Sequence, residues 1–209
     1  MNRITPLLAA AAASLALVAA PAAATAPPAL AISPAPAEAE QLVRVALDTT
    51  RGRIVLDLDR GRAPITTANF LHYIDSGRFN GIGFYRAMKS GSGGLIQGGI
   101  TDDARKLFPA IKHESTTKTG LKNVAGAIAM ANGGPGTAHS DFFIMTSDFP
   151  SLDATATDAG FAAFGHVVEG MDVAKAILDA PVSPTRGSGA MRGQMLEPVV
   201  KIVKAERVK

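Results

Sequence analysis

The chain has 209 residues, no cysteine, 21 basic and 18 acidic residues, and a formal net charge of +3 at pH 7. The lack of cysteine excludes disulfide bonds and attachment as a lipid-modified lipoprotein. The charges are scattered and no basic run is interleaved with aromatic residues, so we expect no nucleic-acid partner.

We predict that residues 1–24 form a secretory signal peptide. A short basic start, Met1–Arg3, precedes the apolar run Leu7–Ala20, and Ala22–Ala24 supplies an Ala-x-Ala cleavage site. The alternative, an uncleaved membrane anchor, fits less well because the apolar run is too short to span a bilayer comfortably. We therefore expect a periplasmic or secreted protein with no stable membrane insertion after cleavage. The Ala/Pro-rich composition is typical of bacterial proteins and favours the periplasm.

Residues 25–40 are rich in alanine and proline, which predicts an extended linker that buries little surface. The remaining residues, 41–209, are enough for one domain with a full core, which we expect to be a monomer. Apolar and polar residues alternate along Leu42–Asp48 and Arg53–Asp59. This two-residue period predicts a hairpin of two strands, each with one buried face.

A helix is predicted between Pro64, which suits a first helical turn, and Gly77, which suits a helix end. A second helix is predicted at Met171–Leu178, and a closing strand at Val199–Val208. Short strands are predicted between the helices at Phe84–Met88, Leu95–Gln97, Ala127–Ala131, Phe142–Thr146 and Ala162–Val167. Many strands with only two helices favour an antiparallel sheet closed into a barrel or folded as a sandwich, with helices covering its ends.

The sequence carries none of the usual groupings for hydrolytic or metal-dependent catalysis. His139, Ser140 and Asp141 are the three residue types of a catalytic triad, but neighbours on an extended chain point in alternating directions. The histidines show no metal-ligand spacing, and no phosphate-binding loop motif occurs. We therefore expect no cofactor and no metal. An unrelated β-barrel hydrolase is disfavoured because it would need a nucleophile paired with a base.

The most informative segment is Ala127–Thr146, AIAMANGGPGTAHSDFFIMT, in which a glycine–proline turn separates two strands. This segment and several others resemble the cyclophilins, in the same order, from about Val43 to Val203. The matching blocks are Thr67–Phe70, Phe79–Arg86, Ile96–Gly99, Ala129–Pro135, Ser140–Ile144 and Phe161–Met171. Six blocks in order are far more specific than a single glycine-rich loop.

The resemblance implies a mainly β protein, a closed eight-stranded antiparallel β-barrel capped by two α-helices, and peptidyl-prolyl cis-trans isomerase activity on proline-containing polypeptides. Peptide-bond rotation has a barrier of about 18–20 kcal/mol because nitrogen shares its lone pair with the carbonyl. Twisting an X–Pro bond frees that lone pair, so a donor placed there binds the twisted state better than either planar isomer. By analogy with the matching position, Arg86 is the catalytic candidate, because its charged, planar guanidinium suits this role.

The same resemblance implies the substrate-binding residues. They are Leu95, Gln97, Ala131, Asn132, Asp141, Phe143, Leu152 and Phe161. Gln97 would bond the substrate backbone near the rotating bond, and Ala131 and Asn132 would hold that backbone through main-chain contacts. Two alternatives stay open here: Gln97 could serve only loop backbone groups, and Arg86 could belong to a surface salt bridge.

The apolar members of this set would form the proline pocket. Leu95, Phe143 and Leu152 would line it, and Phe161 would close its side. Phe143 and Leu152 could instead be ordinary core residues. Phe142 is predicted to be core, because consecutive side chains on a strand point to opposite faces.

Two polar positions depart from the family pattern. Tyr85 replaces the usual histidine, and its neighbour Arg86 should point the other way. Asp141 replaces the usual glutamine and adds a negative charge near the pocket rim. Asp141 could pair with Arg86 or alter substrate preference.

Three further departures thin the pocket. Ser151 stands where an aromatic residue is usual, Gly94 stands where phenylalanine is frequent, and Ser90–Gly93 looks like a flexible insert. The resemblance therefore implies weaker pocket burial, lower activity and poor cyclosporin binding. The alternative function is a low-activity chaperone or binding module for proline-containing segments.

Overall fold

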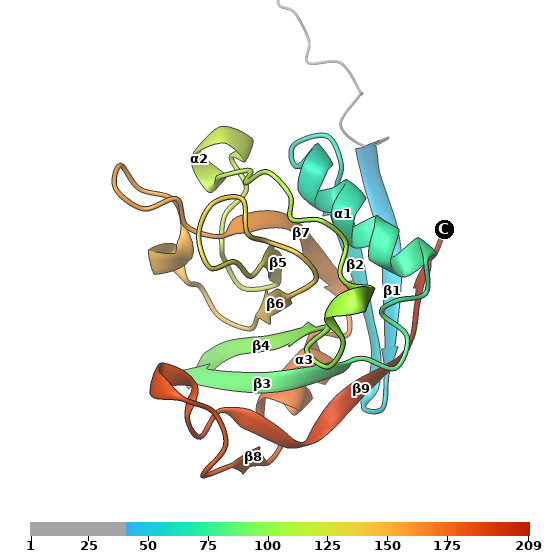
Figure 1. Ribbon diagram of the computed structural model, residues 1–209, viewed down its shortest axis with the longest axis vertical. Coiled ribbons are helices and arrows are strands. Elements are labelled where there is room, and N and C mark those ends of the chain that lie inside the picture. Colours follow the sequence, from blue (N-terminus) through green and yellow to red (C-terminus); the bar gives the residue numbers. More distant parts are fainter. Residues whose placement is uncertain (1–40) are drawn as a thin grey trace, which may run out of the picture. The chain divides into compact units, whose positions relative to one another are not determined.

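The computed structural model of the chain describes residues 41–209 (Figure 1). The predicted signal peptide, 1–24, and the predicted linker, 25–40, lie outside the described residues. Within the described range, no helix has both the length and the apolar character that a membrane crossing requires.

The described domain is built from nine strands and three α-helices. The strands are β1 (Leu42–Thr49), β2 (Gly52–Asp59), β3 (Gly83–Ser90), β4 (Gly93–Gly99), β5 (Ala127–Met130), β6 (Phe142–Met145), β7 (Ala162–Glu169), β8 (Val182–Ser183) and β9 (Met195–Arg207). The helices are α1 (Pro64–Asp75), α2 (Thr116–Thr119) and α3 (Met171–Leu178), with 3-10 turns that include η3 (Pro150–Leu152) and η4 (Gly189–Met191).

Eight of the strands close into an antiparallel barrel. Their order is β1-β2-β7-β5-β6-β4-β3-β9, and β9 pairs back with β1. The two-residue strand β8 pairs only with β9 and lies outside this ring. Closure of the ring leaves no strand of the barrel with an open edge. The fold class predicted from the sequence is confirmed, and the structure adds β8 and α2, which are too short to show a period.

Two longer helices pack on the barrel. Helix α1 lies against β9, β7 and β2, whereas α3 lies against β4, β2 and β3 (Figure 1). The first residue of α1 is Pro64, as predicted, but its N-cap, Ala63, has no side chain that could accept a hydrogen bond. Glu114 supplies the acceptor instead, at 3.1 Å from the nitrogen of Ile65 and 2.7 Å from that of Thr66. A carboxylate at a helix N-terminus is also favoured by the helix dipole.

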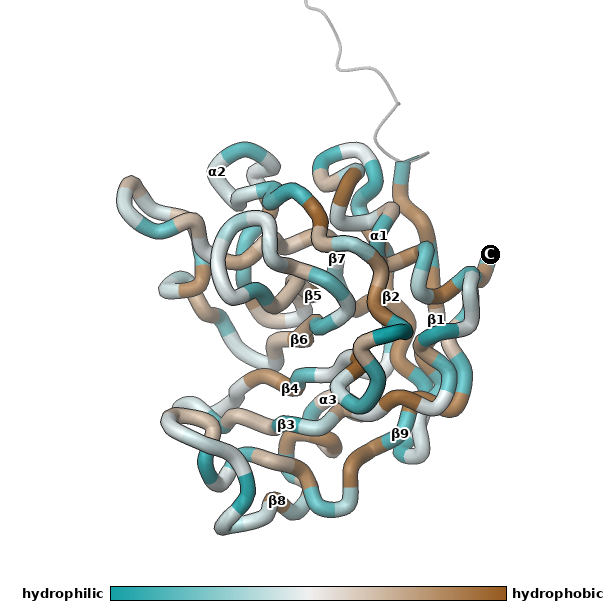
Figure 2. Tube along the Cα trace, viewed as in Figure 1, coloured by the Kyte–Doolittle hydropathy of each residue, from teal (hydrophilic) through white to brown (hydrophobic). Residues whose placement is uncertain are grey.

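The barrel interior is filled by aromatic rings. The ring centroid of Phe70 lies 5.0 Å from that of Phe79, 5.1 Å from that of Phe142 and 5.2 Å from that of Phe164. Hydrophobic residues follow the strands, and hydrophilic ones gather in the connecting loops (Figure 2). The predicted core position of Phe142 is confirmed.

A second apolar cluster lies outside this interior. Phe143, the residue after Phe142, belongs to it, because successive strand residues face opposite sides of the sheet. Its buried members are Leu95, Ala127, Ala129, Phe143, Met145, Phe149 and Ala163. We call these residues the outer cluster; they support the site described below.

The segment Ser90–Gly93 forms the tip of the β3–β4 hairpin. Ser90 is the last residue of β3 and Gly93 the first of β4, so only two residues connect the strands. The expected flexible insert is therefore a two-residue turn with one strand residue on either side. The pairing of this hairpin continues to Ser90 opposite Gly93.

Candidate active site

A β-bulge in β3 lies directly before Arg86. Phe84 lies opposite Gly98 on β4 and Arg86 lies opposite Gln97, so Tyr85 is an extra residue in β3. Strict alternation predicted that Tyr85 and Arg86 point to opposite faces. The bulge interrupts this alternation: the hydroxyl of Tyr85 donates to Oδ1 of Asp141, whereas the guanidinium of Arg86 donates to Oε1 of Gln97.

The guanidinium of Arg86 is half-buried and held by neutral groups. Its Nη1 donates to Oε1 of Gln97 at 2.9 Å, and its Nε donates to Oε1 of Gln194 at 2.8 Å. Its Nη2 lies 3.4 Å from Sδ of Met88. Within residues 41–209, Arg86 forms no ion pair, so the surface salt-bridge alternative is wrong. Burial lowers the pKa of Arg86, although arginine remains protonated in proteins.

A cavity of about 340 Å³ lies beside this guanidinium. It is lined by Arg86, Met88, Leu95, Gln97, Ala131, Asn132, Phe143, Leu152, Phe161 and Met191. The structure thus brings together every predicted site residue except Asp141. The sequence analysis missed Met88 and Met191. The two-residue strand period could have indicated Met88, whereas Met191 lies in the turn η4 and has no sequence signal.

One wall of the cavity is apolar and rests on the outer cluster. The rings of Phe143 and Phe161 meet nearly edge to face, with centroids 5.2 Å apart. Leu95 and Phe143 are buried, and Leu152 is half-buried. Phe143 is therefore both a packing residue of the outer cluster and a wall of the cavity. The wall is the type of surface that a proline ring packs against.

Ala131 and Asn132 lie where β5 passes into the glycine–proline turn. The main-chain nitrogen of Ala131 donates to the carbonyl oxygen of Asp141 at 2.8 Å. The side-chain Oδ1 of Asn132 accepts from the nitrogen of Gly134 at 2.9 Å, which shapes the turn. For hydrogen bonding to a substrate, the main chain of Ala131 therefore offers only its carbonyl oxygen.

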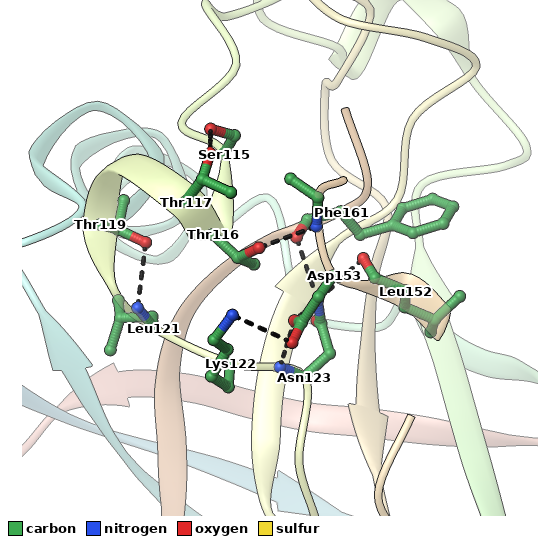
Figure 3. Close-up of polar contacts among 11 residues, drawn as sticks. Ser115, Thr116, Thr117, Thr119, Leu121, Lys122, Asn123, Leu152, Asp153 and Phe161 are labelled. Atoms are coloured by element: carbon green, nitrogen blue, oxygen red, sulfur yellow. Dashed lines mark hydrogen bonds and ion pairs between the residues drawn. The ribbon is translucent and has the colours of Figure 1, made fainter. Parts of the chain in front are cut away.

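A fully buried amide, Asn123, ties together two loops of the cavity wall (Figure 3). Its Nδ2 donates to the carbonyl oxygen of Leu152 at 3.0 Å and to that of Phe161 at 3.3 Å. The same nitrogen lies 2.9 Å from Oδ1 of Asp153. The sequence analysis assigned no role to Asn123, because a single asparagine in a connecting loop forms no pattern.

Asp141 lies outside the cavity lining and forms no ion pair with Arg86, so the suggested pairing was wrong. Its Oδ1 accepts from the hydroxyl of Tyr85 at 2.5 Å, and its Oδ2 accepts from Oγ of Ser140 at 3.2 Å. This position requires glycine at Gly99, where an added Cβ would lie 2.7 Å from Cα and Cγ of Asp141. Burial raises the pKa of Asp141 despite these hydrogen bonds. Burial and the neighbouring Asp141 carboxyl raise the pKa of Tyr85.

Replacing Asp141 by asparagine is expected to stabilise the protein at neutral pH. Because the pKa of Asp141 is raised in the folded state, that state binds the proton more tightly than the unfolded chain does. Ionisation of Asp141 therefore removes stability as the pH rises through the folded pKa, and the effect is absent below the unfolded value of about 3.9. Asparagine avoids this loss and keeps an acceptor for Tyr85.

Thermal unfolding at acidic and neutral pH measures this effect. The Asp141→Asn variant should melt at least about 2 °C above wild type at pH 7, and the difference should shrink toward pH 4. The exposed Asp102→Asn is the matched control and should show no such trend. A difference that does not depend on pH would contradict the argument.

The two positions that lack a usual aromatic residue differ in their surroundings. Ser151 is exposed on η3, next to Leu152 of the cavity wall. Gly94 is enclosed, and an added Cβ would overlap the carbonyl oxygen of Met88 and press against Leu178. No side chain fits at Gly94, and the side chain of Met88 contributes to the cavity lining.

The fold and the site define a β-barrel protein that holds an arginine charge, unneutralised, beside an apolar cavity on its outer face. Residues 43–207 match the model of the family described as cyclophilin type peptidyl-prolyl cis-trans isomerase. The chain belongs to this family. The family and the enzyme class predicted from the sequence, a peptidyl-prolyl cis-trans isomerase, are thereby confirmed.

Individual relatives agree with this assignment. The chain is 36% identical over 141 residues to a peptidyl-prolyl cis-trans isomerase of Acinetobacter baylyi, covering 66% of this chain and 73% of the relative. It is 39% identical over 137 residues to peptidyl-prolyl cis-trans isomerase A of Dickeya dadantii, covering 64% and 70%. A cyclophilin-type isomerase of Cryptosporidium parvum shares the fold, with a TM-score of 0.65 at 21% identity over 80% of this chain and 98% of that one.

Proposed function

We propose that this isomerase accelerates rotation of X–Pro bonds in exported polypeptides, with Arg86 as the catalytic residue. Uncatalysed rotation takes about tens to hundreds of seconds, slow enough to limit folding. The observation that carries the proposal is the Arg86 guanidinium, held by two neutral amide oxygens beside an apolar cavity. That arrangement presents a charged donor to a nitrogen atom that becomes basic only when the bond twists.

The hydrogen bonds of Arg86 leave donors for the substrate. A guanidinium has five N–H groups. Gln194 takes the one on Nε, Gln97 takes one on Nη1, and the sulfur of Met88 takes one on Nη2. One N–H on Nη1 and one on Nη2 remain to donate to the proline nitrogen of the twisted bond. Since amides do not neutralise the charge and the guanidinium is half-buried, the stabilisation is larger than it would be in solution.

The same cavity positions the polypeptide. The proline ring would pack against Phe143, Leu95 and Leu152, with Phe161 at its side. The carbonyl oxygen of Ala131 would accept a hydrogen bond from the substrate backbone. Asn132 and Gln97 would hold that backbone on either side of the rotating bond. These contacts fix the proline while the preceding carbonyl turns, which lowers the entropy cost of reaching the twisted state.

A protease-coupled assay on a short X–Pro peptide tests the activity. The purified chain 41–209 should raise the rate of cis-to-trans conversion in proportion to enzyme concentration. Peptide binding without any acceleration would favour the alternative, a binding module or chaperone for proline-containing segments. Neither binding nor acceleration would contradict both functions.

The export part of the proposal rests on residues 1–24. A basic start, a short apolar run and an Ala-x-Ala site are the features of a cleavable secretory signal. We propose a periplasmic or secreted mature protein that begins at Thr25. Fractionation of bacterial cells that express the full chain, with N-terminal sequencing of the product, tests this. An intact Met1 in the cytoplasmic fraction would contradict it.

We further propose that the mature chain acts as a monomer on proline-containing polypeptides, without binding nucleic acid. The scattered charges of the sequence support the absence of nucleic-acid binding. Light scattering should give the mass of one chain, and a gel-shift titration with duplex DNA should show no complex at physiological salt. A dimer mass or a specific complex would refute the corresponding part.

Cyclosporin is expected to inhibit this isomerase weakly. Ser151 stands where the family usually has an aromatic residue that contacts the drug, and it is exposed beside the cavity wall. Restoring an aromatic residue in Ser151→Trp should raise cyclosporin affinity by about tenfold, the effect of about 1.4 kcal/mol. Inhibition curves with wild type and Ser151→Trp measure it. Tight inhibition of the wild type would refute the alignment around Ser151.

A further inference from the structure

Gln194 contacts the catalytic candidate from a part of the chain to which the sequence analysis assigned no role. It lies between the turn η4 and strand β9, 108 residues from Arg86. Its Oε1 accepts from Nε of Arg86 at 2.8 Å, a shorter contact than the one between Arg86 and Gln97. Gln194 does not line the cavity, so it can influence the reaction through its hydrogen bond to the guanidinium of Arg86.

The orientation of Gln194 is fixed by its other hydrogen bonds. Its Nε2 donates to the carbonyl oxygen of Ala190 at 2.8 Å, so Oε1 is the atom that faces Arg86. Its main-chain oxygen accepts from the nitrogen of Ala87 at 2.9 Å, and its main-chain nitrogen donates to the carbonyl oxygen of Met191 at 3.1 Å. Three neighbouring contacts thus hold the backbone and the amide of Gln194 in place.

The loop before Gln194 is closed by close contacts within its own backbone. Gly187 has φ +90°, and an added Cβ there would overlap the carbonyl oxygen of Met191. The nitrogen of Gly193 donates to the carbonyl oxygen of Arg186 at 3.0 Å, which closes the loop. The same loop carries Met191 to the cavity wall. The loop therefore contributes Met191 to the cavity lining, and Gln194, which follows it, accepts a hydrogen bond from the guanidinium of Arg86.

The two glutamines approach Arg86 from opposite neighbours of β3. Gln97 lies on β4, directly opposite Arg86, whereas Gln194 precedes Met195, the residue that pairs with Arg86 on β9. One hydrogen bond, at Nη1 alone, would leave the guanidinium plane free to pivot. A second hydrogen bond, at Nε, removes that freedom, because Nε and Nη1 are then held at two different points of the planar guanidinium.

We propose that Gln194 is a positioning residue of the isomerase: it fixes the guanidinium plane of Arg86 so that the unused N–H groups face the rotating bond. Because Gln194 is an amide, it orients the charge without neutralising it. The inference rests on the proposed role of Arg86. It predicts that the loss of Gln194 slows the bond rotation in the bound state and leaves substrate affinity unchanged.

The substitution Gln194→Met tests this, since methionine has nearly the same length and no amide oxygen. Exchange NMR on a saturating Ala-Pro peptide gives the bound-state interconversion rate, and a titration gives the dissociation constant. The rate should fall about tenfold, the effect of losing one hydrogen bond to a charged group, while the dissociation constant stays within about twofold. The exposed Gln41→Met is the matched control and should leave both quantities unchanged.

A double-variant comparison and a spectroscopic signal separate positioning from a general structural effect. In the background Arg86→Lys, which has no Nε–H, adding Gln194→Met should change the rate by less than about twofold. The Nε–H signal of Arg86 should be visible in wild type and shift or broaden in Gln194→Met.

Three results would overturn the inference. They are a wild-type rate in Gln194→Met, an equal rate loss in the Arg86→Lys background, and an unchanged Nε–H signal. Absence of catalysis by the wild-type chain would overturn the proposed function itself and this inference with it.

Discussion

Replacing Arg86 by alanine is expected to lower kcat/KM by about two to three orders of magnitude, the usual effect of removing one charged donor from a transition state. This corresponds to about 3–4 kcal/mol of lost stabilisation. The loss should appear in the bound-state rotation rate, because the twisted bond, and not the planar substrate, is the partner of the guanidinium. Exchange NMR and the protease-coupled assay on the same X–Pro peptide measure it.

Controls for this prediction follow from the surroundings of Arg86. The side chain of Arg105 is 91% exposed and, within residues 41–209, pairs only with Asp103, so Arg105→Ala should leave the activity unchanged. Arg86→Lys keeps the charge and loses the planar guanidinium. Its activity should be only slightly higher than that of Arg86→Ala and far below that of the wild type. If Arg86→Ala and the wild type turned over the peptide at comparable rates, Arg86 would not be the catalytic residue.

Replacing Asn123 by alanine is expected to destabilise the domain by about 2–4 kcal/mol, because buried acceptors lose their donor and a cavity forms. Asn123 is fully buried, and its Nδ2 supplies the hydrogen bonds to the carbonyl oxygens of Leu152 and Phe161. These two residues also line the cavity, so substrate affinity should fall together with stability. Urea unfolding gives the first quantity and peptide titration the second.

The neighbour Lys122 provides the control for Asn123. It reaches the same carboxylate, Asp153, at 3.5 Å, but its side chain is 53% exposed. An exposed ion pair contributes only about 0–1 kcal/mol, so Lys122→Ala should stay within that range. A similar loss of stability in both variants would contradict the special role of the buried amide, because the exposed ion pair of Lys122 with Asp153 would then matter as much.

Local patterns in the sequence were enough to predict the strands and an antiparallel sheet, whereas the closed eight-stranded barrel was implied by the family resemblance. The two-residue period along Leu42–Asp48 and Arg53–Asp59 marks strands that the structure contains as β1 and β2. The same period separates Phe142, which faces the interior, from Phe143, which faces the cavity. These predictions succeed because strand alternation is a property of neighbouring residues.

Contacts between distant segments were not predictable in this way. The bulge at Tyr85 breaks the alternation by one residue, and no local pattern announces it. Gln194 reaches Arg86 only because β9 pairs with β3, and Glu114 caps α1 only because a connecting segment passes its N-terminus. Asn123 acts through carbonyl oxygens 29 and 38 residues away. Each depends on tertiary arrangement, which a period in one segment does not encode.

The outer cluster affects how the substrate specificity of this enzyme can change. The cavity rests on a patch of side chains that is separate from the aromatic interior of the barrel. Substitutions at Met88, Leu152 or Met191 can therefore reshape the recognition surface while the packing of aromatic rings in the barrel interior stays intact. Such separation makes the rim evolvable: selection for new client sequences can act there without a large penalty in thermal tolerance. Directed evolution of altered proline-context preference should begin at these three positions.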